Sequence, residues 1–205
     1  EVMKVSGGAG CKGEIEYAVT SKGDCEYAIT RGASDVKKIM GYKKVIFKGD
    51  QEPALKVMMD GIAMLSGGQV IREESPVGES QSNGDVENAV QRIHGQYRSH
   101  KSDTETEYGN KIDPDHPFLA WLVRHSSMTI FRFEKGSDGK TAYKRLKGKN
   151  FSGKILKPGE CCLYLKPKTK GRMKADYRWE DGIWLGMREE SGEHIIGTDK
   201  GVLKA

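Results

Sequence analysis

The sequence predicts an α/β fold followed by a small, basic, all-β unit. Between residues 26 and 97, stretches with apolar residues at helical spacing alternate with short apolar runs that are typical of buried strands. After residue 150 the pattern changes, and short apolar runs alternate with Gly and Pro, as in small barrels and sandwiches. The length of 205 residues and the hydrophobic fraction of 36% allow one large domain or two small ones with a real core.

The first elements follow from glycine placement and apolar periodicity. Residues 1–20 are expected to form a flexible lead-in, because several glycines fall near the start of the chain. A helix is expected over 26–40, where apolar residues recur at helical spacing, and Gly41 is a suitable stop. Residues 44–48 predict a short buried strand, with Asp50 just beyond its end.

A second strand and two further helices complete the predicted core. The range 53–65 predicts a helix, because proline suits a first helical turn and the apolar residues share one face. Residues 69–72 predict another strand, and 73–84 predict a loop rich in Ser, Gly and Pro. Asp85 then opens a helix, and we place the whole α/β core within residues 21–110.

The rest of the chain is expected to divide into a connection and a β domain. Residues 99–115 are polar and predict a linker or a frayed helix, and residues 117–133 predict an amphipathic helix. We assign 111–150 to a linking helix and turn, and 151–205 to a small, basic, β-barrel-like domain.

Composition argues against several classes of protein. No apolar run approaches the ~20 residues needed to span a bilayer, so we expect no membrane span. No charged-then-apolar leader opens the chain, so we expect an intracellular protein of the nucleus or cytoplasm. Four cysteines, two of them adjacent, fit neither a disulfide framework nor a zinc site, so no zinc is expected.

Positive charge is concentrated in the rear of the chain. The net charge is +5, but residues 1–131 carry −3 and residues 132–205 carry +8. Such a segment either contacts a polyanion or is an ordinary solvated face. If it contacts nucleic acid, the residues that we expect to do so are Lys144, Arg145, Lys147, Lys149, Lys166, Lys168, Lys170, Arg172 and Lys174.

Two carboxylates are placed where functional groups gather in α/β proteins. Asp50 follows the end of a predicted strand, and Glu87 lies in the first turn of a helix that follows a glycine-rich loop. Carboxylates brought to one sheet edge can hold Mg²⁺ or Mn²⁺. The spacing alone leaves a structural interpretation open, because Asp50 can cap the next helix and Glu87 can stabilise a helix dipole.

Several blocks of sequence resemble the integrase region of copia-like retrotransposon Pol polyproteins. Residues 42–55 resemble the strand that carries the second acid of that family. Residues 75–90, with Ser-Pro followed by Asn-Gly-x-x-Glu, resemble the block that leads into its catalytic helix. Segments beginning at Pro117, Asp138 and Arg178 resemble the helix and β segment that follow the core.

The resemblance covers roughly residues 21–205 and implies an RNase H-like core with an incomplete mixed sheet. It implies an enzyme that trims DNA ends and transfers strands, with Asp50 and Glu87 as the second and third of three acids that bind Mg²⁺ or Mn²⁺. It further implies that the ends of the element and the target DNA are partners. It also implies a homo-oligomer that is associated with a particle.

The sequence also departs from the family pattern, because the first acid would fall before Glu1 or within the first residues of the chain, and no aspartate occurs there. The resemblance therefore implies a truncated or decayed copy, and whether the chain is an enzyme stays open. The alternative is a non-catalytic nucleic-acid-binding relic of a retroelement Pol protein. A third hypothesis is an ordinary interaction module whose basic residues provide solubility.

Overall fold

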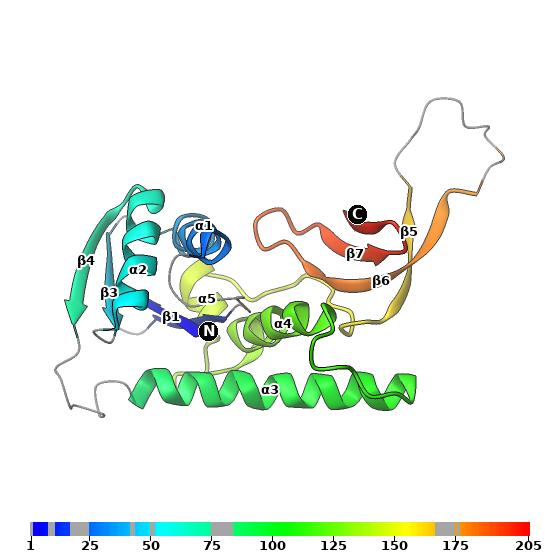
Figure 1. Cartoon of the computed structure of the whole chain (residues 1–205), viewed down its shortest axis with the longest axis horizontal. Helices are drawn as coiled ribbons and strands as arrows, with labels where there is room; N and C mark the ends of the chain where they lie inside the picture. The colour runs from blue at the N-terminus through cyan, green and yellow to red at the C-terminus, as the bar shows by residue number, and fades with distance from the viewer. Residues whose placement is uncertain are drawn as a thin grey trace.

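The computed structural model describes residues 2–7, 11–16, 25–41, 44–49, 52–74, 84–166, 175 and 177–205. It is a mixed α/β structure with a front part of helices and short strands and a rear part made of one antiparallel sheet (Figure 1). None of the helices in these ranges is long and apolar enough to cross a membrane.

The chain begins with a β-hairpin, where we expected a flexible lead-in. Strand β1 (Val2–Gly7) pairs with strand β2 (Cys11–Glu16) in antiparallel register, from Val2 opposite Glu16 to Gly7 opposite Cys11. The expectation was wrong over the described residues 2–7 and 11–16, and the rest of residues 1–20 lies outside the described part of the chain. Strand β2 lies against the later helices α4 and α5.

A parallel β–α–β unit follows and agrees with the predicted order of elements. Helix α1 (Glu26–Ser34) continues as a π-helical turn, η1 (Asp35–Met40), which ends at Gly41 in a left-handed conformation. Strand β3 (Lys44–Gly49), helix α2 (Pro53–Ser66) and strand β4 (Gln69–Glu74) come next. The two strands pair in parallel but form a sheet separate from the hairpin, although β1 lies beside β3.

Helix α3 (Gly84–Tyr108) is much longer than the sequence predicts and runs beneath both parts of the molecule (Figure 1). We expected a linker or a frayed helix over residues 99–115, because the sequence there is polar, and the structure continues the helix to Tyr108. The helix continues because Lys101 pairs with Glu105 one turn later, and because Tyr108 donates a hydrogen bond to the carbonyl oxygen of Gly159. A polar face can therefore still be helical when its residues bond along the helix and across to another segment.

Two helices and a four-stranded sheet complete the chain. Helix α4 (Phe118–Phe133) is followed by helix α5 (Ala142–Lys147), whose first turn is capped by Thr141. The rear sheet contains β5 (Cys161–Leu165), β6 (Trp179–Met187), β7 (His194–Thr198) and β8 (Gly201–Lys204). These strands are antiparallel and adjacent in sequence order.

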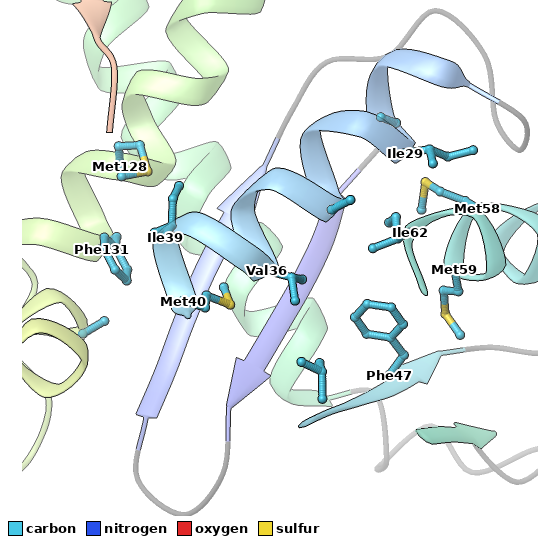
Figure 2. Packing of buried hydrophobic residues seen from close by; sticks show 14 residues of the cluster. Ile29, Val36, Ile39, Met40, Phe47, Met58, Met59, Ile62, Met128 and Phe131 are labelled. Atoms are coloured by element: carbon cyan, nitrogen blue, oxygen red, sulfur yellow. The ribbon is translucent and has the colours of Figure 1, made fainter. Parts of the chain in front are cut away.

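The main hydrophobic core joins α4 to the β–α–β unit. Figure 2 shows Met128 and Phe131 of α4 facing Ile39 of η1, while Phe47 of β3 lies near Ile62 of α2. Residues 111–150 were expected to link two domains. Instead α4 contributes buried side chains to the front core, so it belongs to the fold itself.

A second cluster joins the front part to the rear sheet. Phe118 and Leu122 of α4 pack with Leu185 of β6, and Tyr97 of α3 and Ile195 of β7 pack against them. Trp184, which is 1% exposed, anchors the interior of the rear sheet with Tyr164 and Ile196. The front and rear parts therefore share an apolar seam.

One helical glycine is required by the close approach of α1 and α2. A Cβ atom on Gly61 of α2 would lie 2.8 Å from two side-chain carbons of Ile29 on α1, closer than real contacts allow. Glycine in a helix costs roughly 0.5–1 kcal/mol relative to alanine. At this position that cost is offset by the packing that the missing side chain allows.

We therefore expect Gly61→Ala to destabilise the protein by about 1–3 kcal/mol despite alanine's better helix propensity. The matched control is Gly95→Ala in α3, where a Cβ meets no atom within 4 Å. That control should stabilise the protein by about 0.5–1 kcal/mol. Urea unfolding of both variants measures the two effects, and a stabilised Gly61→Ala would show that α1 and α2 pack less closely than described.

Candidate functional site

The structure describes part of the sheet edge at which the sequence predicts Asp50 and Glu87. Strands β3 and β4 are parallel, so their carboxyl ends share one edge, and both arrowheads point to the side of the molecule where α3 begins (Figure 1). Glu87 is exposed in the first turn of α3. Asp50 follows β3 directly in sequence but lies outside the described residues.

No group of three metal-ligating side chains forms within the described ranges. Glu87 is exposed and belongs to no such group as far as those ranges extend, and its relation to Asp50 stays a prediction. Hard divalent cations need several oxygen ligands, which one carboxylate does not supply.

Some of the predicted basic side chains around α5 bond to other groups among the described residues, and others do not. Arg145 hydrogen-bonds to Asp138 through Nε and Nη2, and Lys147 donates from Nζ to the carbonyl oxygen of Ile39 at 2.6 Å. Lys147 thus caps the end of η1. No side-chain partner for Lys144 or Lys149 is found in the described part of the chain, so these two are the better candidates for phosphate contact.

The remaining predicted basic residues belong to the connection between β5 and β6. Lys166 forms an ion pair with Glu180, whose carboxylate also accepts a hydrogen bond from the Tyr164 hydroxyl at 2.7 Å. Lys166 is therefore engaged within the rear sheet. The others, Lys168, Lys170, Arg172 and Lys174, lie outside the described residues.

A buried charge network lies between the front part and the rear sheet, and the sequence analysis did not predict it. Arg124 of α4 donates to both carboxylate oxygens of Asp35, from Nη1 at 3.0 Å and Nη2 at 3.1 Å. Its Nε donates to Glu189, just beyond β6, at 3.1 Å. Arg31 of α1 donates to the other oxygen of Glu189 at 2.7 Å. One guanidinium therefore connects α4, η1 and the end of β6.

Burial and charge act in opposite directions on the two carboxylates. Burial raises the pKa of Asp35 above its ordinary value, against the attraction of Arg124 and Arg31. Burial also acts to raise the pKa of Glu189, but Arg124 and Arg31 together outweigh it and hold that pKa below its ordinary value. Glu189 is thus the more firmly ionised partner of the network.

A row of rings lies beside this network. The His125 ring is edge-on to His100 at 4.9 Å and to Trp184 at 5.3 Å between centroids, and the Trp184 Nε1–H donates to His194 Nδ1 at 2.9 Å. Burial lowers the pKa of His125 to about 3, and nearby His100 and Arg132 act in the same direction. The row connects α3, α4, β6 and β7 and keeps His125 neutral.

Two cavities open along the same seam. One of about 650 Å³ lies between α1, α4 and strands β6 to β8, and its lining includes Arg31, Arg124 and Arg132. The other, of about 450 Å³, lies between α4, the segment near Phe151 and the turn after β6. Arg132 lines both cavities.

The sequence of α4 contains a pattern that indicates a buried charge at this seam. Arg124, Met128 and Arg132 are spaced four residues apart, so two arginines share a helix face with an apolar core residue. A cation on an apolar face implies a buried partner. The partners Asp35 and Glu189 are far away in sequence, so no local pattern identifies them.

Comparison with known proteins yields a distant likeness to a solved structure. No family model matches the chain, and no curated protein sequence matches it. A chain in the cryo-EM structure of the simian T-cell lymphotropic virus intasome in complex with PP2A regulatory subunit B56 gamma aligns with a TM-score of 0.36 and 13% identity. The alignment covers 86% of this chain and 61% of that chain, so this chain spans less than two thirds of its length. At this TM-score the likeness carries no argument about fold or activity.

We expect Asp35→Asn to lower the free energy of unfolding by about 3 kcal/mol, because it leaves the buried Arg124 with one fewer carboxylate. The control Asp103→Asn removes an exposed pair with Lys157 and should change stability little. Chemical denaturation of both variants provides the comparison. Equal, small effects would mean that the seam does not depend on the network.

The lowered pKa of His125 predicts an acid-dependent loss of stability. The unfolded chain binds a proton at His125 near pH 6.5, whereas the folded chain binds it only near pH 3. This contribution is complete above pH 6.5 and is lost as the pH falls toward 3, by up to about 1.4 kcal/mol per pH unit. In His125→Gln, the denaturation midpoint should vary less between pH 7 and 4.5 than in the parent. An unaltered slope in His125→Gln would contradict the assignment.

Proposed function

We propose that the chain is part of a retrotransposon integrase with an RNase H-like core and takes part in DNA integration. The observation that carries the proposal is the parallel β3–α2–β4 arrangement followed by α3. It directs the carboxyl end of β3, after which Asp50 comes next in sequence, toward the side on which α3 begins (Figure 1). Glu87 lies exposed in the first turn of α3. The ordered blocks in residues 42–55 and 75–90 support the same assignment.

In this proposal Asp50 and Glu87 would hold Mg²⁺ or Mn²⁺. Glu87 is suited to this role in the respect that the structure describes, because its carboxylate is open to solvent at the start of α3. The bound ions would supply Lewis acidity and stabilise the attacking and leaving oxygens of a phosphoryl transfer. The protein's own contribution is to hold two carboxylates at one edge of a sheet.

DNA would be held through phosphate contacts, largely without sequence preference. The rear residues 132–205 carry +8, and Lys144 and Lys149 present side chains with no partner among the described residues. Basic residues of this kind neutralise phosphates and release counterions. The partners would be the element's ends and target DNA, bound by several copies of the chain.

A non-catalytic nucleic-acid-binding role is the second candidate. It requires only the basic residues of 132–205 and no complete metal site, since a site of two carboxylates would bind metal more weakly than a site of three. The two candidates share DNA binding and differ in whether a divalent metal and Glu87 matter.

We expect strand transfer on labelled DNA with Mn²⁺ to fall on the order of 100-fold or more in Glu87→Gln, because members of a catalytic unit act together. The control Glu107→Gln removes an exposed carboxylate at the far end of α3 and should leave the rate unchanged. DNA binding without strand transfer in any of the three proteins would exclude the integrase proposal for this chain and support the binding role.

The double variant Lys144→Ala/Lys149→Ala should reduce the slope of log K against log salt by about 2, because two phosphate contacts are lost. Lys37→Ala, which removes an exposed cation from η1, should leave the slope unchanged. Fluorescence anisotropy over a salt series measures both. An identical slope in the double variant would place the DNA interface elsewhere.

A further inference from the structure

Arg132 is a buried cation that forms no hydrogen bond or ion pair with an anion among the described residues. Its residue is 5% exposed, and its Nε has no hydrogen-bond partner. Its guanidinium carbon lies 4.5 Å from the centroid of the Phe151 ring, which is an attractive contact but not a neutralising one. A buried guanidinium without an acceptor is costly, so its presence calls for a partner.

The charge network and Arg132 together contain one more guanidinium than carboxylate. Along the seam, the guanidiniums of Arg31, Arg124 and Arg132 face the carboxylates of Asp35 and Glu189. Both carboxylates bond to Arg31 and Arg124, and no ion pair with Arg132 is found within the described part of the chain. Burial lowers the pKa of Arg132, while Glu189 is close enough to act in the opposite direction. One further anion would complete the charge balance.

The space beside Arg132 suits a small ligand. Arg132 lines both cavities, of about 650 Å³ and 450 Å³, and these volumes fall in the usual range for small-molecule pockets. Arg188 also lines both cavities. In the smaller cavity, the lining adds Lys154 and the aromatic rings of Tyr143 and Phe151, so cations and apolar walls meet there.

We propose that Arg132 anchors a binding site for a small phosphate-bearing ligand in the cleft between α4 and the turn that follows β6. A planar guanidinium matches the oxygens of a phosphate and can donate two hydrogen bonds to it. The aromatic walls suit a base or another planar group attached to that phosphate. The ligand is a free phosphate or a nucleoside monophosphate, and the two differ in whether they use the apolar walls.

The test is thermal unfolding of the full chain with inorganic phosphate or adenosine monophosphate, without DNA and without divalent metal. Phosphate at a hundredfold excess over its Kd should raise the Tm on the order of 5 °C. Arg132→Met should abolish this shift, whereas Arg98→Met, which removes an exposed arginine of α3, should retain it. Because neither Glu87 nor DNA enters the measurement, its result is independent of the proposed integrase activity.

The same variants test the charge argument in phosphate-free buffer. There, Arg132→Met should have a Tm equal to or above that of the parent, because it removes an unpaired buried charge. A lower Tm would mean that Arg132 is satisfied internally and would overturn the proposal, as would an equal phosphate shift in both arginine variants. A larger Tm shift with adenosine monophosphate than with phosphate would show that the ligand also contacts the apolar walls. Equal Tm shifts would show that the site binds free phosphate.

Discussion

The ion pairing of Arg124 is the interaction on which the arrangement of the molecule depends. Its three nitrogen donors are divided between Asp35 and Glu189, which come from opposite ends of the sequence. Apolar contacts at the seam tolerate small shifts, whereas a bidentate guanidinium pair fixes both distance and direction. The network therefore sets how the rear sheet lies against the front core, and the Phe118, Leu122 and Leu185 cluster fills the space that this orientation defines.

The π-helical turn explains how Asp35 reaches that network. Turn η1 begins at Asp35, and the Gly41 N–H bonds to the carbonyl oxygen of Val36 five residues earlier. Wider turns of this kind are rare and occur often at functional positions. Here the turn buries Val36, Ile39 and Met40 in the front core while Asp35 itself is 1% exposed. One short element thus serves the apolar core on one side and the charge network on the other.

Local patterns in the sequence were enough to predict most helices and strands. Helix α1 with its stop at Gly41, strand β3 and helix α2 follow from spacing and from glycine and proline placement, which act over a few residues. The hairpin β1–β2 was missed because glycines mark turns as well as flexible segments. The role of α4 was missed because an amphipathic stripe shows that a face is buried but not which partner buries it.

The candidate site was predictable to a smaller extent. Glu87 lies exposed at the start of a helix as expected, and the position of Asp50 stays a prediction. Arg145, Lys147 and Lys166 were expected to face nucleic acid, yet each has a partner within the protein. Sequence shows the amount of charge in a segment, but only three-dimensional contacts show which charges are already neutralised.

The two small sheets of the front part bear on association between copies of the chain. Strands β1 and β3 lie side by side without forming one ladder, and β3 and β4 carry exposed Ile46 and Ile71. A strand edge with unpaired N–H and C=O groups is a template for another strand. Pairing of such an edge with another copy of the chain becomes more frequent as the concentration of the protein rises.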